Sequence, residues 1–375
     1  MSMTTPSAPA PGTPPSRRGP ARRALAALTA LMTVVGVASA LVVGPASPAR
    51  AFGTIGELAE HERITRAALG CATGAIAECF QPRSLDQVAG KKGTFGAVGS
   101  PDNPLTGELF TSAAHCDNAD YVQGPEYRPG EDRRRATAAL LGCVEHARAM
   151  VRRGVRRAGD LLDGNGRIRP AEVSLTPSFL PPHSADCTFN RVAGRVKCDV
   201  IESFGQALHA VQDFYSHSNW TDRAAPGPIT VHNPPGAGHD TISPLFALFG
   251  PDPAAKDVDD RLTTGCFDTL SAATGEKAGC KDDGRTRLKH AWINKDTGVI
   301  DPVTGATSCV NHGKNVCTAR GQVGDNFAHA VHAAIGDTRR QWQDLATAVR
   351  HAYPGARGDR IVCALTHDDP VATCH

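Results

Sequence analysis

Three side chains that commonly bind metal ions lie close together in the segment His209-Ala-Val-Gln-Asp213-Phe-Tyr-Ser-His217. An α-helix turns about 100° per residue, so positions four residues apart share one face. His209, Asp213 and His217 would therefore form one stripe. Imidazole and carboxylate groups suit zinc. Burying three such groups in an otherwise apolar helix is costly unless something binds them, so the spacing favours a metal site over a satisfied polar patch.

The elements that must position this stripe are predicted to be helices. Apolar residues recur every three or four positions at 56–69, 131–162, 199–217 and 324–352. No run of alternating residues predicts a strand. Gly205 lies one turn before His209 on the stripe, where a missing side chain lets another backbone segment come close. The segments between the helices are rich in Gly, Pro and Asp, so we predict an all-α bundle with long loops.

The 12 cysteines form six neighbouring pairs. An even number in an exported chain favours disulfides, and short local loops are the simplest connectivity. No pair has the C-x-x-C spacing of a cysteine zinc site. The predicted pairs are Cys71–Cys79, Cys116–Cys143, Cys187–Cys198, Cys266–Cys280, Cys309–Cys317 and Cys363–Cys374.

The first 51 residues have the order of an export signal. Four arginines between Arg17 and Arg23 precede an apolar run from Ala24 to Val43, and small residues follow as far as Ala51. This order predicts a signal peptide over residues 1–51 and a secreted chain whose first residue is Phe52. An uncleaved membrane anchor is the alternative, because the apolar run is long enough to span a bilayer.

Removing the predicted signal changes the charge balance. The whole chain has 40 basic and 38 acidic residues, a formal charge of +2. Five arginines lie in residues 1–51, which leaves 35 basic against 38 acidic residues, a charge of −3. This balance excludes a basic nucleic-acid binder, and we expect no stable nucleic-acid complex. No later segment is long and apolar enough to be a transmembrane helix.

The segment from Phe204 to Trp220 resembles the signature of the zinc-dependent phospholipase C and single-strand nuclease superfamily. The similarity is greatest to its secreted branch of Het-C-like and CinY-like proteins, and weaker similarity extends over most of 52–350. The resemblance implies a phospholipase C-like helical bundle with disulfide-stapled loops that binds up to three zinc ions. We predict a metal-binding domain over 52–352 and a tail over 353–375 that the Cys363–Cys374 pair ties down.

The resemblance implies that one zinc ion binds the N-terminal amine and carbonyl of the mature chain and a histidine of the first helix. The matching residues are Phe52 and His61. It also implies that Asp213 bridges two of the ions and that His209 completes one of them.

A second element of the resemblance is an aspartate followed by a histidine, which matches Asp102 and His115, thirteen positions apart. Asp117 and Asp120 are alternatives to Asp102. Asp102 could also serve as a general base, because a partly free carboxylate beside zinc suits either role.

The third ion would take His217 with a later histidine and carboxylate. The enzymes of the superfamily place the second histidine of the central helix ten residues after the first, whereas the spacing here is eight, as in the Het-C-like branch. We predict His290 and Asp296 as the remaining ligands, although six residues is not a one-face helical spacing. The alternatives are His239 with Asp240, and His329 or His332 with Asp337.

Two functions fit these residues. The first is a secreted zinc-dependent phosphodiester hydrolase, more similar to phospholipase C than to a nuclease, in which a metal-bound hydroxide attacks the phosphorus and Asp102 and Asp213 are catalytic. Phospholipid is the leading candidate substrate. The second is a non-catalytic secreted protein of the same fold, in which zinc stabilises the structure or a partner interface. The altered spacing of the third site favours the second function.

Overall fold

The structure, a computed structural model, describes residues 53, 58–74, 76–91, 93–106, 108–124, 131–175, 186–191, 194–267, 281–282 and 285–375. All of them belong to one contact unit, Pro48–His375. The predicted signal peptide lies outside the described residues, and so do Phe52 and Cys280.

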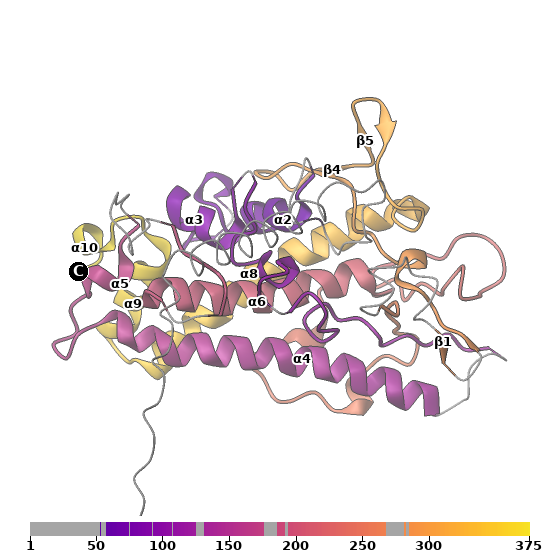
Figure 1. Cartoon of the computed structure of the whole chain (residues 1–375), viewed down its shortest axis with the longest axis horizontal. Helices are drawn as coiled ribbons and strands as arrows, with labels where there is room; N and C mark the ends of the chain where they lie inside the picture. The colour runs from indigo at the N-terminus through magenta and orange to yellow at the C-terminus, as the bar shows by residue number, and fades with distance from the viewer. Residues whose placement is uncertain are drawn as a thin grey trace, which may run out of the picture. The chain divides into compact units, whose positions relative to one another are not determined.

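The predicted metal-ligand stripe lies on helix α6 (Val196–His217), which is the central helix of the fold. Of its 22 residues, only Asp199 is not buried. A helix that is buried on all sides needs neighbours around its whole circumference. These neighbours include α3 (Pro82–Ala89), α4 (Glu131–Ala158), α5 (Pro170–Val173), α8 (Asn326–Ala352) and the short 3-10 helix η2 (Ser100–Asp102). The long helix α4 runs alongside α6 (Figure 1).

The remaining described helices surround α6 or extend from its neighbours. The α-helices are α2 (Glu60–Leu69), α3 (Pro82–Ala89), α4 (Glu131–Ala158), α5 (Pro170–Val173), α8 (Asn326–Ala352), α9 (Ala356–Thr366) and α10 (Pro370–Thr373). The other 3-10 helices are η1 (Cys71–Thr73), η3 (Gly159–Leu161), η4 (Pro244–Phe246), η5 (Ala255–Asp257), η6 (His290–Trp292) and η7 (Val323–Asp325).

Apolar side chains join α6 to its neighbours. Phe204 of α6 and Phe80 both approach the buried Trp342 of α8, with ring centroids 5.7 and 4.6 Å from the indole. Leu140 and Val151 place the apolar stripe of α4 in the same core. One polar bond adds to this packing, because the hydroxyl of Tyr215 on α6 donates to Asp337 of α8 at 2.7 Å.

The described strands are short and form three antiparallel pairs. They are β1 (Lys281–Asp282) with β2 (Arg285–Thr286), β3 (Val299–Ile300) with β4 (Thr307–Ser308), and β5 (Val310–Asn311) with β6 (Lys314–Asn315). Two-residue strands carry no alternating pattern, so the sequence did not reveal them. The described chain is thus mostly helical. None of its helices is long and apolar enough to cross a membrane.

Five of the six predicted disulfides are confirmed. They join Cys71–Cys79, Cys116–Cys143, Cys187–Cys198, Cys309–Cys317 and Cys363–Cys374. Cys266 is also disulfide-bonded. These bonds close loops of 8 to 27 residues, which is the local pattern that the spacing of the cysteines predicts.

The four predicted helices all exist, with shifted ends. The helix predicted over 131–162 ends as an α-helix at Ala158 and continues as the 3-10 helix η3. The helix predicted over 199–217 begins three residues earlier, at Val196. The segment after Gly355, predicted as a tail, forms the 11-residue helix α9, closed by the Cys363–Cys374 disulfide.

Candidate metal centre

Four segments far apart in the sequence meet on one face of α6. Helix α2 contributes His61, η2 contributes Asp102, the turn after it contributes His115, and the segment beginning at η6 contributes His290 and Asp296. Together with the three residues of α6, they form three groups that could each hold a metal ion. These groups are His61/His209/Asp213, Asp102/His115/His209 and His217/His290/Asp296.

The first group connects α2 to the centre of α6. The Nε2 atom of His61 lies 3.1 Å from Oδ1 of Asp213, and its ring stacks on that of His209 with centroids 4.3 Å apart. His61 follows Glu60, whose carboxylate accepts a bond from the main-chain nitrogen of Gly53 at 2.8 Å. The chain next to the predicted mature N-terminus therefore lies close to His61, although Phe52 itself is outside the described residues.

The second group surrounds the other carboxylate oxygen of Asp213. His115 Nδ1 and His209 Nε2 each lie 3.0 Å from Asp213 Oδ2, and 2.9 Å from one another. Oδ1 of Asp102 lies 3.8 Å from both nitrogens. Asp213 therefore turns one oxygen to each of two groups, the arrangement expected of a bridging ligand.

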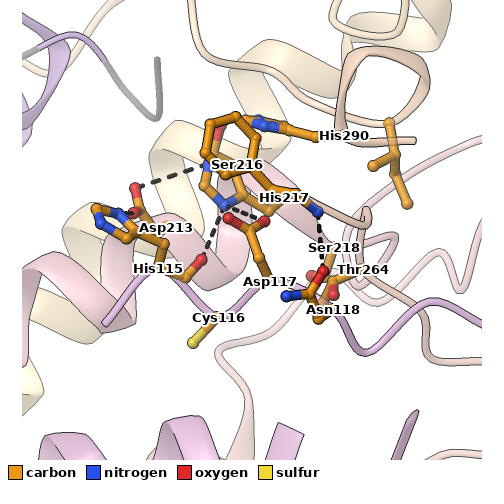
Figure 2. A network of polar contacts seen from close by, with 12 residues as sticks. His115, Cys116, Asp117, Asn118, Asp213, Ser216, His217, Ser218, Thr264 and His290 are labelled. Atoms are coloured by element: carbon orange, nitrogen blue, oxygen red, sulfur yellow. Dashed lines mark hydrogen bonds and ion pairs between the residues drawn. The ribbon is translucent and has the colours of Figure 1, made fainter. Parts of the chain in front are cut away.

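The third group lies at the C-terminal end of α6. Nε2 of His217 is 3.3 Å from Oδ1 of Asp296, and Nε2 of His290 is 2.9 Å from the other oxygen of that carboxylate. Ser216 donates its hydroxyl to Asp296 Oδ1 at 2.5 Å. Figure 2 shows His217 among these groups, with dashed contacts to Asp213 and Asp117.

The second nitrogen of three of these histidines is fixed by a hydrogen-bond acceptor. Nδ1 of His209 donates to the carbonyl of Val98 at 2.9 Å, and Nδ1 of His217 donates to the carbonyl of His115 at 2.8 Å. Nδ1 of His61 donates to Oε1 of Gln212 at 2.7 Å. In a neutral ring, a proton on Nδ1 leaves the lone pair on Nε2, which is the form that binds metal.

This tautomer makes the contacts with Asp213 informative. A lone pair on Nε2 and a carboxylate oxygen about 3 Å away repel each other unless a proton or a metal ion lies between them. Ligand atoms about 2.0–2.1 Å from a tetrahedral zinc ion are about 3.3 Å from one another. The separations of 2.9–3.8 Å in the second group are of this size.

Several buried polar atoms of the centre make no hydrogen bond within the described part of the chain. They include Oδ1 of Asp213 and Nε2 of His217, both of which face candidate ligands. Buried polar groups without hydrogen bonds are costly and rare in native proteins. The donor set, the tautomers and these atoms agree in fitting metal ions.

The electrostatics of the centre couple the histidines to the aspartates. Burial disfavours the charged form of His115, but the hydrogen bond to Asp213 and the nearby Asp102 carboxylate outweigh it and raise its pKa to about 9. Burial alone would raise the pKa of Asp213, yet the surrounding imidazoles, His209 first, hold it well below its usual range. Asp213 is therefore ionised at neutral pH.

The candidate ligands differ in their access to solvent. The side chains of Asp102 and His115 are 10% and 8% exposed, whereas those of His61, His209 and Asp213 are 0% exposed. Solvent therefore reaches the centre from the side of Asp102 and His115.

The alternative ligands that the sequence left open are engaged elsewhere. Asp117 lies 3.1 Å from Nδ1 of His217, the nitrogen that faces away from the third group. Asp120 pairs with Arg135 and Arg287. These contacts leave Asp102 as the aspartate of the second group.

The alternative pairs for the third group also lie apart from it. His239 pairs with Asp259 at 3.0 Å rather than with Asp240, which contacts Arg223. Asp337 is buried against Tyr215 and Arg340. The structure brings His290 and Asp296 to His217 instead.

Some residues of the centre were not singled out from the sequence. Gln212 holds His61 and donates its own amide to Thr65 and Thr338 at 3.0 and 3.1 Å. Ser216 holds Asp296. Both are fully buried polar residues in an apolar helix, and that unusual placement is the signal that could have revealed them.

One further cluster, Cys363, His367 and Cys374, has the ligand types of a metal site. Its two sulfur atoms are joined in a disulfide, so they cannot act as thiolate ligands in this state.

Comparison of the chain with protein-family models, with curated proteins and with solved structures finds no match.

Proposed function

We propose that this chain is a secreted zinc-dependent phosphodiester hydrolase of the phospholipase C and single-strand nuclease superfamily. The observation that supports it best is the pair of groups that share Asp213. Two fixed imidazole nitrogens, of His61 and His209, and the Nδ1 atom of His115 point at the two oxygens of one ionised carboxylate. Adjacent metal ions joined by a carboxylate suit reactions in which negative charge builds on a phosphate.

In this proposal, Asp213 and Asp102 have different roles. When bound, zinc ions lower the pKa of coordinated water and stabilise the negative charge of a phosphate. Asp213 keeps two metal groups at a fixed separation. Asp102 is the most exposed candidate ligand, and its Oδ1 lies 3.8 Å from both nitrogens of its group, so it is placed to accept a proton from an attacking water.

A second function, a metal-stabilised protein without activity, is favoured by the depth of the centre. No candidate ligand among the described residues has a side chain more than 10% exposed. Buried metal groups that join segments far apart in the sequence would stabilise the fold outright. The two functions share the metal ions and differ in activity, so one set of measurements separates them.

The experiment measures zinc per chain by plasma mass spectrometry on the chain purified after export, followed by assays on phospholipid vesicles and single-stranded nucleic acid. The variants are His209→Ala and Asp213→Ala, and the control is His332→Ala, an exposed histidine of α8. We expect up to three ions, with loss of ions and of hydrolysis in both variants and not in the control.

The outcomes distinguish the two functions. Bound zinc with hydrolysis of phospholipid, abolished by Asp213→Ala, would support the hydrolase. Bound zinc with no hydrolysis of either substrate would support the metal-stabilised protein. If the chain binds no metal and His209→Ala folds normally, both proposals are wrong.

A further inference from the structure

In the group of His217, His290 and Asp296, no α-helix fixes the positions of His290 and Asp296. His290 lies in the 3-10 turn η6, and Asp296 lies six residues later in a segment outside any described helix or strand. Side chains in such a segment have no regular backbone to fix their direction. Yet the carboxylate of Asp296 lies within 3.3 Å of His217 and within 2.9 Å of His290, so it joins the two rings. Besides the bond from Ser216 to Asp296, contacts of the neighbouring residues must hold this segment against the end of α6.

Lys295, the neighbour of Asp296, supplies such contacts on both sides of His217. Its main-chain nitrogen donates to the carbonyl of Ser216 at 3.1 Å, and its ammonium group donates to the carbonyl of Ser218. Ser218 caps the C-terminal end of α6, where a positive charge interacts favourably with the helix dipole. The side chain of Lys295 is 0% exposed, so these bonds are shielded from water.

Two further charged residues fix the ammonium group of Lys295. Oδ1 of Asp222 forms an ion pair with it at 2.9 Å, and Oδ2 of Asp222 accepts a bond from Nε of Arg320 at 2.8 Å. The side chains of Asp222 and Arg320 are 0% and 3% exposed. A buried ionic triad contributes little net stability, because removing the charges from water offsets their attraction. Its position behind the third group suggests a role in geometry instead.

We propose that Lys295, held by Asp222 and Arg320, is a positioning residue that sets His290 and Asp296 against His217 for binding of the third metal ion. The inference rests on the metal centre of the proposed function. Lys295 belongs to none of the three groups and acts through the backbone on either side of His217 and through the adjacent Asp296. Residues that orient metal ligands in this way typically change metal affinity about 10- to 100-fold when they are removed.

The chain offers a matched control in Lys197, a second buried lysine on α6. Its ammonium group donates to Ser84 and to the carbonyl of His367 at 2.9 and 2.7 Å, away from the metal groups. Lys295→Met and Lys197→Met each remove a buried amino group and keep a similar volume. A general loss of stability would appear in both variants, whereas a loss of positioning would appear in one.

The test titrates the metal-free full chain with zinc and follows heat release, and repeats the titration with cobalt, whose visible absorption reports the geometry of each ion. We expect Lys295→Met to bind one ion about 10- to 100-fold more weakly and the remaining ions unchanged. Lys197→Met should bind every ion like the unaltered chain. Arg320→Met, which leaves Lys295 in place, should weaken the same ion and serves as the second variant if Lys295→Met does not fold.

Two results would overturn the inference. In the first, Lys295→Met and Arg320→Met bind every ion with unaltered affinity and unaltered cobalt absorption, so the triad is only structural. In the second, Lys197→Met loses the same ion, so the effect is one of general stability. If the unaltered chain binds no metal at all, the proposed function itself fails, and this result is distinct from the other two.

Discussion

At the scale of single residues, the chain buries two lysines in α6 and its surroundings, and Lys197 is the one outside the metal centre. Burial in the core lowers its pKa to about 7, despite the opposing attraction of Asp368. An unfolded lysine titrates near 10.4. Between these two values the unfolded chain binds more protons at this site than the folded chain does.

This difference predicts a stability that increases with pH. Above about pH 10.4 the lysine is neutral in both states, and below about pH 7 it is charged in both, so the folded state carries the full cost of the buried charge only at low pH. From pH 7 to pH 10 the free energy of unfolding should rise by up to about 1.4 kcal/mol per pH unit through Lys197. Urea unfolding of the unaltered chain and of Lys197→Met, across this range, measures the difference.

Other groups titrate in the same pH range. The contribution of Lys197 is therefore the difference in slope between the unaltered chain and Lys197→Met. We expect Lys197→Met to have a smaller positive slope than the unaltered chain. Parallel slopes would show that Lys197 stays charged in the folded state, with the carbonyl of His367 and the hydroxyl of Ser84 as sufficient partners.

At the scale of elements, the segment before η2 packs directly against α6 at Gly205. A Cβ atom on Gly205 would lie 2.4 Å from the carbonyl carbon of Ala97, which is closer than atoms can pack. The next residue, Val98, accepts the hydrogen bond from His209 that fixes its tautomer. A few residues later the same segment delivers Asp102. The glycine therefore sets the distance between α6 and the second metal group.

The substitution Gly205→Ala should damage both stability and metal binding. The added methyl group pushes the segment away from α6, at a cost of about 1–3 kcal/mol, and lengthens the bond that orients His209. Gly142→Ala is the control, because Gly142 is an exposed glycine of α4 with no neighbour that a methyl group would meet. It should gain about 0.5–1 kcal/mol. Thermal unfolding and zinc titration of both variants check this, and zinc affinity unchanged in Gly205→Ala would contradict it.

The elements also show what the sequence could predict. The ligand stripe of α6 and the close approach at Gly205 were both predicted. Each residue of a helix turns by a constant 100°, so the spacing of residues in the sequence fixes which of them share a face. The structure places Ala97 against Gly205, as the missing side chain indicated. The six local cysteine pairs were predicted for a related reason, since short loops leave few alternatives.

The remaining residues could not be assigned by spacing. His290 and Asp296 were chosen over His239 and Asp240 without a helical face to support them. The contacts that hold them include the bond of Ser216 to Asp296 and the main-chain bond of His290 to Cys266, and neither belongs to a motif. Asp102 could not be separated from Asp117, because Asp102 lies thirteen residues before His115 and Asp117 two residues after it, and neither spacing places the two side chains on one helix face. Their directions are set by tertiary contacts, which a single sequence does not display.

At the scale of the whole molecule, the Cys116–Cys143 disulfide ties the metal centre to α4. Cys116 lies between His115 and Asp117, both of which reach side chains of the centre, and Cys143 lies in the middle of α4. This disulfide closes a loop of 27 residues. The Cys309–Cys317 disulfide, which encloses the β5–β6 pair, closes a loop of only 8 residues. The Cys116–Cys143 disulfide therefore restricts the unfolded chain more strongly and also positions a ligand.

Removing this disulfide should have two effects that a remote one lacks. The double variant Cys116→Ala/Cys143→Ala should lose about 3 kcal/mol of stability and bind zinc more weakly at the group of His115. The matched variant Cys309→Ala/Cys317→Ala should lose less stability, because its loop is shorter, and keep its zinc affinity. Urea unfolding and zinc titration check both. Equal zinc affinity in the two variants would show that α4 does not position His115.

The distribution of the candidate ligands along the chain has a consequence for folding. They extend from His61 to Asp296, and no group is complete within one segment. Contacts between residues so distant in sequence form late, because much of the chain must be ordered before they can close. The centre would thus accept its full complement of ions only after α2, α6 and the segment beyond η6 have met. Metal uptake would then be the last step of folding, and a chain that failed to bring these segments together would lack its full complement of metal.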